Sequence, residues 1–348
     1  MTILKKIFSL LFLTSIPYSK DDLEQAQKQL AEDFRKKDVW DPFGYIVNAK
    51  EQQKSLQRIL ASYIFIKQNP SFLKRARLQY NAIAIILFIV SLYLFSSHVY
   101  ISSFILALSI FVFITYRSFV YGFTKSLVKL AIARENDYLY FSTKETNLWD
   151  KMKQLHPVVF RRGNSNQYVY DLFFGKVNIK GKPCNFIAGL FTYGVTRHRS
   201  KGTHTKTYVG NFVMLQNDKK FRKSFSVVSQ KAKNVFPFTV IPFKTESLEF
   251  NKKFHIYTET KDAESDIGIA SVLTPAVVDS IVRLNKETKE LIISFADDGL
   301  LMHTEGYLLK KMKTKFTKSA EIHPDDKKVI VDKINAIANI SGEILEYN

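Results

Sequence analysis

The sequence predicts an α+β protein in which a two-helix transmembrane hairpin is followed by a strand-rich antiparallel α+β cytoplasmic domain, with further helices at the N-terminus. Two uncharged apolar runs, residues 82–95 and 101–116, lie almost back to back and predict the hairpin. After residue 157, short segments rich in Val, Tyr, Phe and Thr alternate in part between apolar and polar residues, which is typical of antiparallel strands. We therefore expect four regions: an N-terminal helical region with a short apolar start (1–79), the transmembrane hairpin (80–117), a helical connector (118–156) and an α+β soluble domain (157–348).

The two apolar runs are close to the minimum length for crossing a bilayer. With its interfacial edges, each is about 17–18 residues long, against a hydrocarbon core of roughly 30 Å. Only Ser97, His98, Val99 and Tyr100 separate them, so the chain must turn back at once. The alternative is a helical hairpin buried in a soluble core.

Basic residues flank both ends of the predicted hairpin, whereas the turn carries only His98. Lys and Arg next to membrane spans are retained on the cytoplasmic side. The sequence therefore predicts a two-span protein of the cell inner membrane with both termini in the cytoplasm. The juxtamembrane basic residues are Lys74, Arg75, Arg77, Arg117, Lys125 and Lys129.

The N-terminus allows two interpretations. Lys5 and Lys6 precede a mostly apolar stretch at residues 7–16, which is similar to the start of a secretory signal. Pro17 fits poorly before a cleavage site after Ser19, and the stretch is too short to span a bilayer. We favour an uncleaved interfacial helix, and a cleaved signal peptide is the alternative.

Composition restricts the class of protein. The net charge of +19 and the pI of about 9.6 suit either an anionic membrane surface or nucleic acid. The single Cys184 excludes an internal disulfide and a cysteine-based zinc site. We expect no resident metal and no cofactor.

The helices follow from caps and apolar periodicity. Residues 19–39 predict a helix capped by Ser19 or Asp21, and residues 50–68 predict a second. Residues 119–136 extend the second span, and residues 143–153 predict a further helix. Pro275 at the first turn and Thr274 as the cap predict a helix at 275–287, and a final helix is expected at 324–340.

Alternation and turn residues predict the strands. Residues 291–295 and 300–303 form a hairpin with Asp298-Gly299 in the turn. The other predicted strands are residues 158–161, 167–179, 185–193, 207–215, 221–228, 236–242 and 253–258.

Three segments together resemble a known family. They are ESLEFNKKFHIYTE (246–259), SVLTPAVVDSIVRL (271–284) and the hairpin LIISFADDGLLMH. The chain over residues 70–310 resembles the uncharacterised bacterial two-pass membrane proteins with a domain of unknown function numbered 3137. The resemblance implies this topology and no particular reaction.

One basic segment is the main candidate for a contact site. Residues 196–207 contain no acid. They predict either a solvated hairpin loop or a basic finger that contacts lipid phosphates or an acidic partner. Metal binding is disfavoured because its two histidines lack a third ligand. The candidate contact residues are Arg197, His198, Arg199, Lys201, His204 and Lys206.

No segment forms a recognisable catalytic motif. Asp297 and Asp298 are interpreted as turn residues, and Glu249 as the partner of a backbone group or a lysine. Nucleic acid is disfavoured as a partner because the aromatic residues, such as Phe173 and Phe212, follow strand patterns that predict burial.

The function that we expect is a membrane-anchored scaffold or binding module at the cytoplasmic surface. Its partners would be the lipid bilayer, and a protein or anionic lipid head groups. The alternative is a membrane-bound hydrolase or transferase with a site built around Glu249, Asp171 or a histidine of perturbed pKa. A small channel is a third hypothesis, and whether the chain forms an oligomer is left open.

Overall fold

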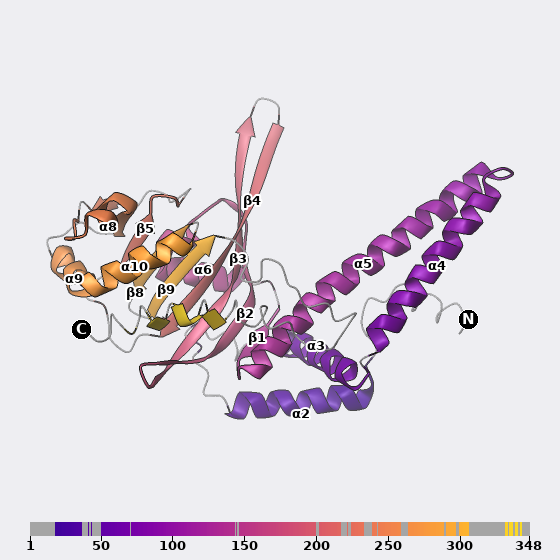
Figure 1. Cartoon of the computed structure of the whole chain (residues 1–348), viewed down its shortest axis with the longest axis horizontal. Helices are drawn as coiled ribbons and strands as arrows, with labels where there is room; N and C mark the ends of the chain where they lie inside the picture. The colour runs from indigo at the N-terminus through magenta and orange to yellow at the C-terminus, as the bar shows by residue number, and fades with distance from the viewer. Residues whose placement is uncertain are drawn as a thin grey trace. The chain divides into compact units, whose positions relative to one another are not determined.

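The computed structural model of the chain is shown in Figure 1. It describes residues 18–36, 41, 43, 50–69, 71–142, 144, 146–199, 202–216, 221, 224–232, 239–241, 243–258, 264–288, 290–296 and 299–305, and parts of 331–342. The chain divides into two compact units. A helical unit comprises Met1–Lys36, Gln53–Ile132 and Met312–Pro324, and a sheet unit comprises Lys37–Gln52, Ala133–Lys311 and Asp325–Asn348.

The sheet unit is built on one antiparallel sheet of nine described strands. Their order is β1-β2-β3-β4-β9-β8-β5-β7-β6, so the β8–β9 hairpin lies between β4 and β5. The strands are β1 (Leu139–Phe141), β2 (Ser165–Ile179), β3 (Lys182–Arg199), β4 (Gly202–Gln216), β5 (Phe225–Ser229), β6 (Thr239–Ile241), β7 (Phe254–Thr258), β8 (Leu291–Ala296) and β9 (Gly299–Glu305). The predicted β8–β9 hairpin is confirmed.

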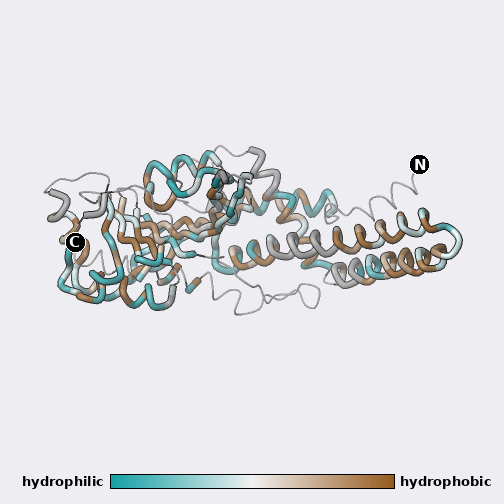
Figure 2. Tube along the Cα trace, turned by 90° about the horizontal axis from the view of Figure 1, so that it is seen from above, coloured by the Kyte–Doolittle hydropathy of each residue, from teal (hydrophilic) through white to brown (hydrophobic). Residues whose placement is uncertain are grey.

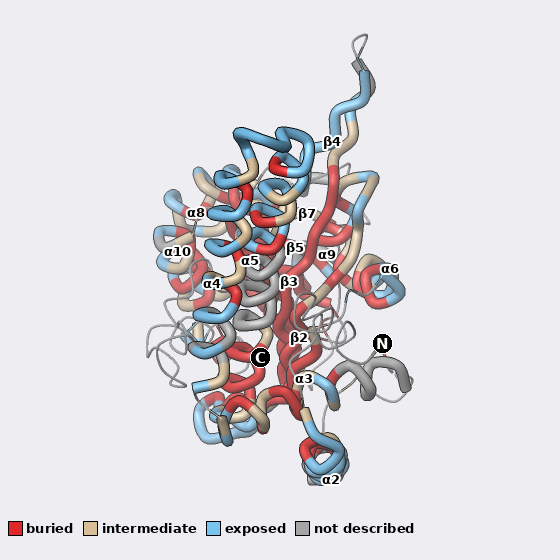
Figure 3. The backbone as a smooth tube through the Cα atoms, turned by 90° about the vertical axis from the view of Figure 1, so that its right-hand side faces the viewer, coloured by how far each residue is buried: buried red, intermediate tan, exposed pale blue. Residues whose placement is uncertain are grey.

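Helices lie on both faces of this sheet. In Figures 1 and 3, α10 (Pro275–Glu287) lies on one side of the sheet and α6 (Thr146–Leu155) on the other. The short helices α7 (Pro157–Phe160), α8 (Leu248–Lys253) and α9 (Glu264–Val272) also belong to this unit. Helix α10 begins as predicted, because the Thr274 side chain accepts from the Val277 amide and Pro275 occupies the first turn.

An aromatic cluster forms the core beneath α6. Trp149 is fully buried and packs edge-on against Phe160 of α7, with ring centroids 5.1 Å apart. Phe160 in turn contacts Phe191 of β3 and Phe212 of β4. These contacts attach α6 and α7 to the central strands, so Trp149 is the packing anchor of this face.

The helical unit begins with α2 (Lys20–Lys36). Its cap is Ser19, whose hydroxyl accepts from the Asp22 amide at 3.0 Å while the Asp22 carboxylate accepts from the Ser19 amide at 2.7 Å. Helix α3 (Lys50–Gln68) has the predicted bounds.

Helices α4 (Phe72–Leu94) and α5 (Val99–Glu135) form a hairpin held by serine hydroxyls. Ser91 and Ser102 each donate to the other's backbone carbonyl, at 3.0 and 2.7 Å. Ser109 donates to the carbonyl of Ala84 at 2.8 Å. The polar side chains therefore lie between the helices, and hydrophobic residues predominate along both arms near the turn (Figure 2).

The predicted transmembrane hairpin is wrong as a membrane element. Among the described helices, none is both long enough and apolar enough to cross a bilayer. Helix α4 already ends at Leu94, so its uncharged part after Arg77 is about 25 Å long at 1.5 Å per residue, short of roughly 30 Å. The transmembrane fold class and the predicted location as a two-span inner-membrane protein are corrected accordingly.

Other predictions also differ from the structure or lie outside it. Residues 158–161 were predicted as a strand but belong to the short helix α7, since Pro157 begins a helical turn and a short buried apolar run suits either structure. The short strand β1 and helices α8 and α9 were missed. Residues 1–17, which include Lys5, Lys6 and the stretch 7–16, lie outside the described residues, as do Asp297, Asp298 and most of the predicted final helix.

Replacing Trp149 by alanine is expected to remove about 3–5 kcal/mol from the free energy of unfolding, because it empties the space between α6, Phe160 and Phe191. Urea denaturation of the full chain measures this loss. Gln154→Ala, on the exposed side of the same helix, is the matched control and should cost little. Equal losses in the two variants would contradict the assigned core.

Candidate functional site

The most unusual feature of the sheet unit is the length of β3 and β4. Strand β2 pairs with β3 only as far as Gly194, and β9 pairs with β4 only as far as Gly210. Beyond these positions β3 and β4 pair with each other up to Arg199 and Gly202. Residues 195–199 and 202–209 therefore form a two-stranded ribbon, here named the β3–β4 arm, which projects beyond its neighbouring strands (Figure 1).

The register of the arm separates its side chains into two chemically different faces. The pairs Thr196–Thr205 and Gly194–Thr207 lie on one face, where the Thr196 and Thr205 hydroxyls are 2.9 Å apart. The pairs Arg197–His204, Val195–Lys206 and Tyr193–Tyr208 lie on the other, which is here named the basic face. Its residues are Tyr193, Val195, Arg197, His204, Lys206 and Tyr208.

The basic face changes from exposed to buried along its length. Arg197, His204 and Lys206 are exposed, Tyr208 is intermediate and Tyr193 is buried. Figure 3 shows β4 passing through the same sequence of burial from its tip to the sheet. The charged end of the arm is therefore open to a partner, while its base is part of the core.

Two stacked tyrosines connect the arm to the core. The Tyr193 and Tyr208 rings are nearly parallel, with centroids 5.2 Å apart. The Lys206 ammonium lies 5.0 Å from the centroid of the Tyr208 ring, and the Arg162 guanidinium lies 5.1 Å from that of Tyr193. The cations favour the electron-rich ring faces, which stabilises this stack.

Beneath the tyrosines lies a buried group of charged and polar residues. The Arg162 Nη2 atom is 2.6 Å from Glu290 Oε1, and both side chains are almost completely excluded from solvent. Arg162 Nη1 donates to His303 Nε2 at 3.0 Å. Arg162 precedes β2, Glu290 precedes β8 and His303 belongs to β9, so the sheet topology assembles the group from distant parts of the chain.

The partners of His303 define its protonation. Its Nδ1 lies 3.0 Å from the carbonyl oxygen of Asn211, which can only accept, so Nδ1 carries the proton. Its Nε2 faces Arg162, which can only donate, so Nε2 is the acceptor. Burial also lowers the pKa of His303, and the ring is therefore neutral.

Glu290 is ionised beside this neutral ring. Burial alone would raise the pKa of Glu290, but its polar surroundings outweigh burial and lower its pKa overall. The positive charge is that of the Arg162 guanidinium, which lies 2.6 Å from the carboxylate, whereas the neutral His303 Nε2 is 3.7 Å away. The group thus holds one buried ion pair and one neutral imidazole.

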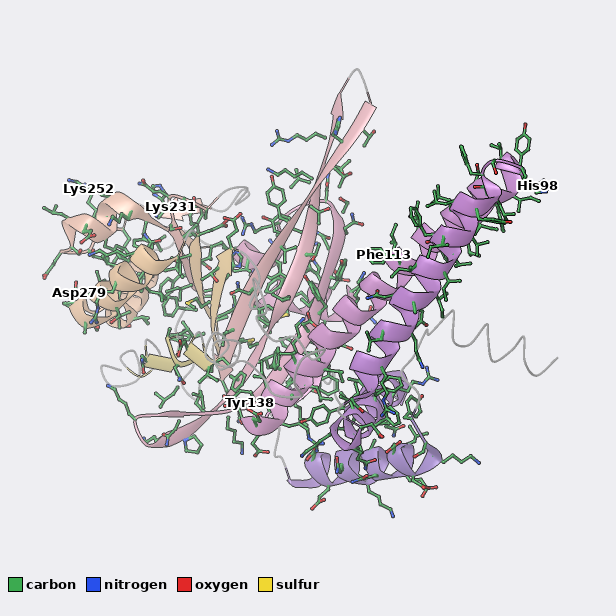
Figure 4. All side chains as sticks on the ribbon, turned by 45° about the vertical axis from the view of Figure 1, so that its right-hand side comes forward. His98, Phe113, Tyr138, Lys231, Lys252 and Asp279 are labelled. Carbon is green, nitrogen blue, oxygen red and sulfur yellow. The ribbon has the colours of Figure 1, made fainter. Side chains whose placement is uncertain are left out.

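A small pocket opens beside this group. Its volume is about 80 Å³, room for a few water molecules or one small group. Gly210 lines it and leaves no room for a side chain, because a Cβ atom there would lie 2.5 Å from Phe191 and 2.6 Å from His303. Lys231, which follows β5 and is labelled in Figure 4, lies at the pocket with Glu305. The lining residues are Arg162, Tyr193, Tyr208, Val209, Gly210, Lys231, Glu290, His303 and Glu305.

The geometry of this pocket does not suit acid–base chemistry. A general base needs a lone pair within hydrogen-bonding reach of the substrate, and both ring nitrogens of His303 are already engaged. Burial raises the pKa of Tyr193 to about 12, so its phenol stays protonated at neutral pH. The carboxylate of Glu290 is held by Arg162. These residues are best interpreted as the rigid base of the β3–β4 arm.

For the predicted contact segment the sequence allowed a solvated hairpin loop or a basic finger, and the structure shows a pair of strands. Arg197, His204 and Lys206 share the basic face. His198 and Arg199 belong to β3, but their side chains lie outside the described residues, as does Lys201 altogether. The structure therefore brings three of the six predicted contact residues together.

The two predicted juxtamembrane residues whose side chains are described, Arg75 and Lys129, differ in exposure. Arg75 is exposed and donates to the Ser71 hydroxyl at 2.7 Å, whereas Lys129 is buried. The side chains of Lys74, Arg77, Arg117 and Lys125 lie outside the described part of the structure. Without membrane spans among the described helices, the term juxtamembrane no longer applies to these residues.

The two carboxylates named for a catalytic site lie elsewhere. Glu249 is on the surface of α8 and accepts from Lys253 at 2.6 Å, and that bond lowers its pKa, so its predicted pairing with a lysine is confirmed. Asp171 sits at a β-bulge and accepts from the Tyr140 hydroxyl at 2.6 Å. Neither carboxylate borders the pocket.

The sequence did not single out Arg162, Glu290 or His303, although each carries a weak signal. Arg162 is in a polar RRG segment directly after a buried apolar turn, and His303 interrupts an apolar strand. A polar residue on the inner side of a strand needs a buried partner. Which partner each one has depends on the strand order, which no local pattern reveals.

Comparison with known proteins adds no assignment. No family model matches the chain and no curated protein matches it, so the resemblance to the two-pass family stays a prediction. Among solved structures, the mycobacterial trehalose monomycolate transport factor A aligns over 63% of this chain and 93% of its own, with 8% identity and a TM-score of 0.35. A likeness this distant carries no functional argument.

Breaking the buried ion pair is expected to be costly. Glu290→Gln leaves the Arg162 guanidinium buried without a counter-charge, which should remove about 3–5 kcal/mol from the free energy of unfolding. The double variant Arg162→Met/Glu290→Leu should regain most of this loss. Glu249→Gln, which breaks an exposed pair, is the control and should change stability little. Wild-type stability of Glu290→Gln would show that the pair is not buried.

A second buried histidine predicts acid sensitivity. Burial lowers the pKa of His156 to about 3 in the folded state, from 6.5 when exposed. The contribution of the neutral His156 ring to the free energy of unfolding is fully present above pH 6.5. It is lost as the pH falls, because His156 then takes up a proton in the unfolded chain but not in the folded one. When the pH is lowered from 7.5 to 5, the free energy of unfolding of the wild type should fall by about 2 kcal/mol more than that of His156→Leu.

Urea denaturation at these two pH values measures the difference. The exposed His255→Leu is the matched control and should follow the wild type. Identical pH dependence of wild type and His156→Leu would mean that His156 is accessible to water in the folded state.

Proposed function

We propose that this chain is a non-enzymatic binding module that engages an acidic protein segment through the basic face of the β3–β4 arm. The observation that carries the proposal is the projection of two paired strands beyond the sheet with Arg197, His204 and Lys206 exposed on one face. A strand pair with no other described strand beside it at its outer end presents side chains and backbone to a partner.

The chemistry of the arm favours an acidic partner. Arg197 and Lys206 are both exposed, and His204 adds a third basic side chain directly opposite Arg197 on the neighbouring strand. The segment 196–207 contains no Asp or Glu, so its positive charge is not neutralised within the arm's own sequence. Complementary charge of this kind steers a partner and fixes its orientation.

The same face argues against recognition of nucleic-acid bases. Base stacking needs exposed aromatic rings interleaved with basic residues. Tyr193 is buried, and Tyr208 has Tyr193 stacked on it and the Lys206 ammonium at its ring. The aromatic residues of this face therefore support the arm, and the charged residues remain for contact with a partner.

The hydrolase or transferase hypothesis has less support. It would need a pocket that holds a free acid or base, whereas the histidine at the described pocket has both nitrogens engaged. The volume of about 80 Å³ is also smaller than the several hundred Å³ of typical substrate pockets.

A labelled peptide of about twelve residues with alternating Glu and Ser tests the proposal by fluorescence anisotropy. The full chain should bind it at about 50 mM salt and more weakly at about 300 mM, because exposed charges are screened. Arg197→Ala/Lys206→Ala should weaken binding about five-fold, which corresponds to two exposed charge contacts.

Two controls make this experiment decisive. Lys28→Ala/Lys252→Ala removes the same charge from exposed positions elsewhere and should bind like the wild type. A peptide with Gln in place of Glu should not bind. Equal weakening of binding by the two double variants would contradict the assignment of the basic face as the contact surface. The proposal would also be contradicted if a single-stranded oligonucleotide bound more tightly than the acidic peptide and this binding depended on Arg197.

A further inference from the structure

The outer surface of the α4–α5 hairpin is apolar over most of its length. The side chains of Ile85, Phe88, Leu92, Phe104 and Phe113 are each about half exposed or more. Figure 4 labels His98 at the turn and Phe113 on α5, with side chains pointing outward along both arms. The remaining exposed large apolar residues are Leu78, Ile86, Ile89, Val90, Tyr93, Phe95, Val99, Tyr100, Ile101, Leu106, Ile110, Phe111 and Ile114.

Three serine side chains of the hairpin are turned inward and are already hydrogen-bonded. The hydroxyls of Ser91, Ser102 and Ser109 all bond to backbone carbonyls of the opposite helix. No charged residue lies between Arg77 and Arg117. A partner for the outer surface therefore meets neither charge nor free hydroxyl from these serines, and the partner surface must itself be apolar.

A groove runs between the two helices on one side of the hairpin. Its volume is about 440 Å³, and its lining is almost wholly apolar. Ile85 and Phe88 form one wall and Ile110 and Phe113 the other, with Ala84 and Ser109 at the floor. Because Ala84 and Ser109 are small, the groove can accept large side chains.

The spacing along both walls suits another helix pair. On α4, Ile85, Phe88 and Leu92 follow one another at intervals of three and four residues. On α5, Leu106, Ile110 and Phe113 follow at intervals of four and three. This is the spacing of the core positions of coiled coils and helical bundles.

The exposed area matches what a stable dimer needs. At roughly 150–250 Å² for a whole large side chain, the exposed parts of the described apolar residues sum to on the order of 1,500 Å². A typical interface buries only about 800 Å² on each partner. About half of this exposed apolar area, which is spread over all sides of the hairpin, is therefore enough for a typical interface, and a monomer rarely exposes so large an apolar surface.

We infer that the groove side of the α4–α5 hairpin is the contact between two copies of this chain, which meet as an antiparallel four-helix bundle. A second copy brings a surface of the same length, the same absence of charge and the same three- and four-residue spacing. A two-fold axis lets Phe88 and Phe113 of each copy enter the groove of the other, so the contact closes on itself at two copies. This inference does not rest on the proposed function of the β3–β4 arm.

Sedimentation equilibrium of the full chain between about 1 and 100 µM tests the inference. The wild type should be a dimer. The variant Phe88→Glu/Phe113→Glu should raise the dissociation constant of the dimer at least ten-fold. Val99→Glu/Tyr100→Glu places the same two charges at the turn, away from the groove, and should remain dimeric. The groove variant should bind the acidic peptide like the wild type, which would show that loss of the dimer and loss of binding by the arm are independent.

A covalent measurement covers the case in which the groove variant fails to fold. In a Cys184→Ala background, Phe113→Cys should form a disulfide-linked dimer on mild oxidation, and Tyr100→Cys should do so far less. A wild type that stays monomeric at the highest concentration would overturn the inference. So would a Phe113→Cys chain that does not cross-link, or a chain that floats with neutral phosphatidylcholine vesicles as a monomer.

Discussion

The buried ion pair between Arg162 and Glu290 is the constraint on which the sheet unit depends. Removing two charges from water costs several kcal/mol for each ion, and only close approach with further hydrogen bonds offsets that cost. Here the ions are 2.6 Å apart, and Arg162 also donates to His303. Arg162 precedes β2, whereas Glu290 directly precedes the β8–β9 hairpin and His303 belongs to it, so this contact can form only when the hairpin is inserted between β4 and β5. A wrong strand order would leave at least one buried charge alone.

The same contact explains how the β3–β4 arm can project. An isolated two-stranded ribbon is at best marginally stable in water, so a projecting arm needs a firm base. The base is provided by the Tyr193–Tyr208 stack, which rests on the Arg162 guanidinium. Arg162 therefore links the strand order of the sheet to the orientation of the arm. The basic residues of the arm are held by a rigid core, which reduces the entropy lost when a partner binds.

Local signals in the sequence predict some elements well and fail where the outcome depends on distant partners. Thr274-Pro275, and the Asp298-Gly299 pair between the apolar runs of β8 and β9, act over a few residues, and helix α10 and the hairpin have nearly the predicted bounds. The outer part of the arm was predicted as a hairpin loop or a basic finger because it is polar, and its strand character comes from the cross-strand register with Thr196 and Thr205. The α4–α5 helices were predicted, but the predicted membrane crossing was wrong. An apolar run shows that a surface avoids water, and it does not show whether lipid or protein covers that surface. The pairing of Arg162 with Glu290 needs the sheet order and was beyond sequence reasoning.

Two surfaces of opposite chemistry follow from this arrangement. The basic face of the arm attracts charge and weakens in salt, whereas the hairpin surface has no charge from residue 78 to 116 and gains from the exclusion of water. One partner surface cannot satisfy both, since an acidic segment placed on the hairpin would lose its hydration without a counter-charge. The two surfaces belong to different compact units, the arm to the sheet unit and the hairpin to the helical unit. A chain that joins two such surfaces is suited to bringing two different contacts together, and that is the physical basis of the two proposals made for them.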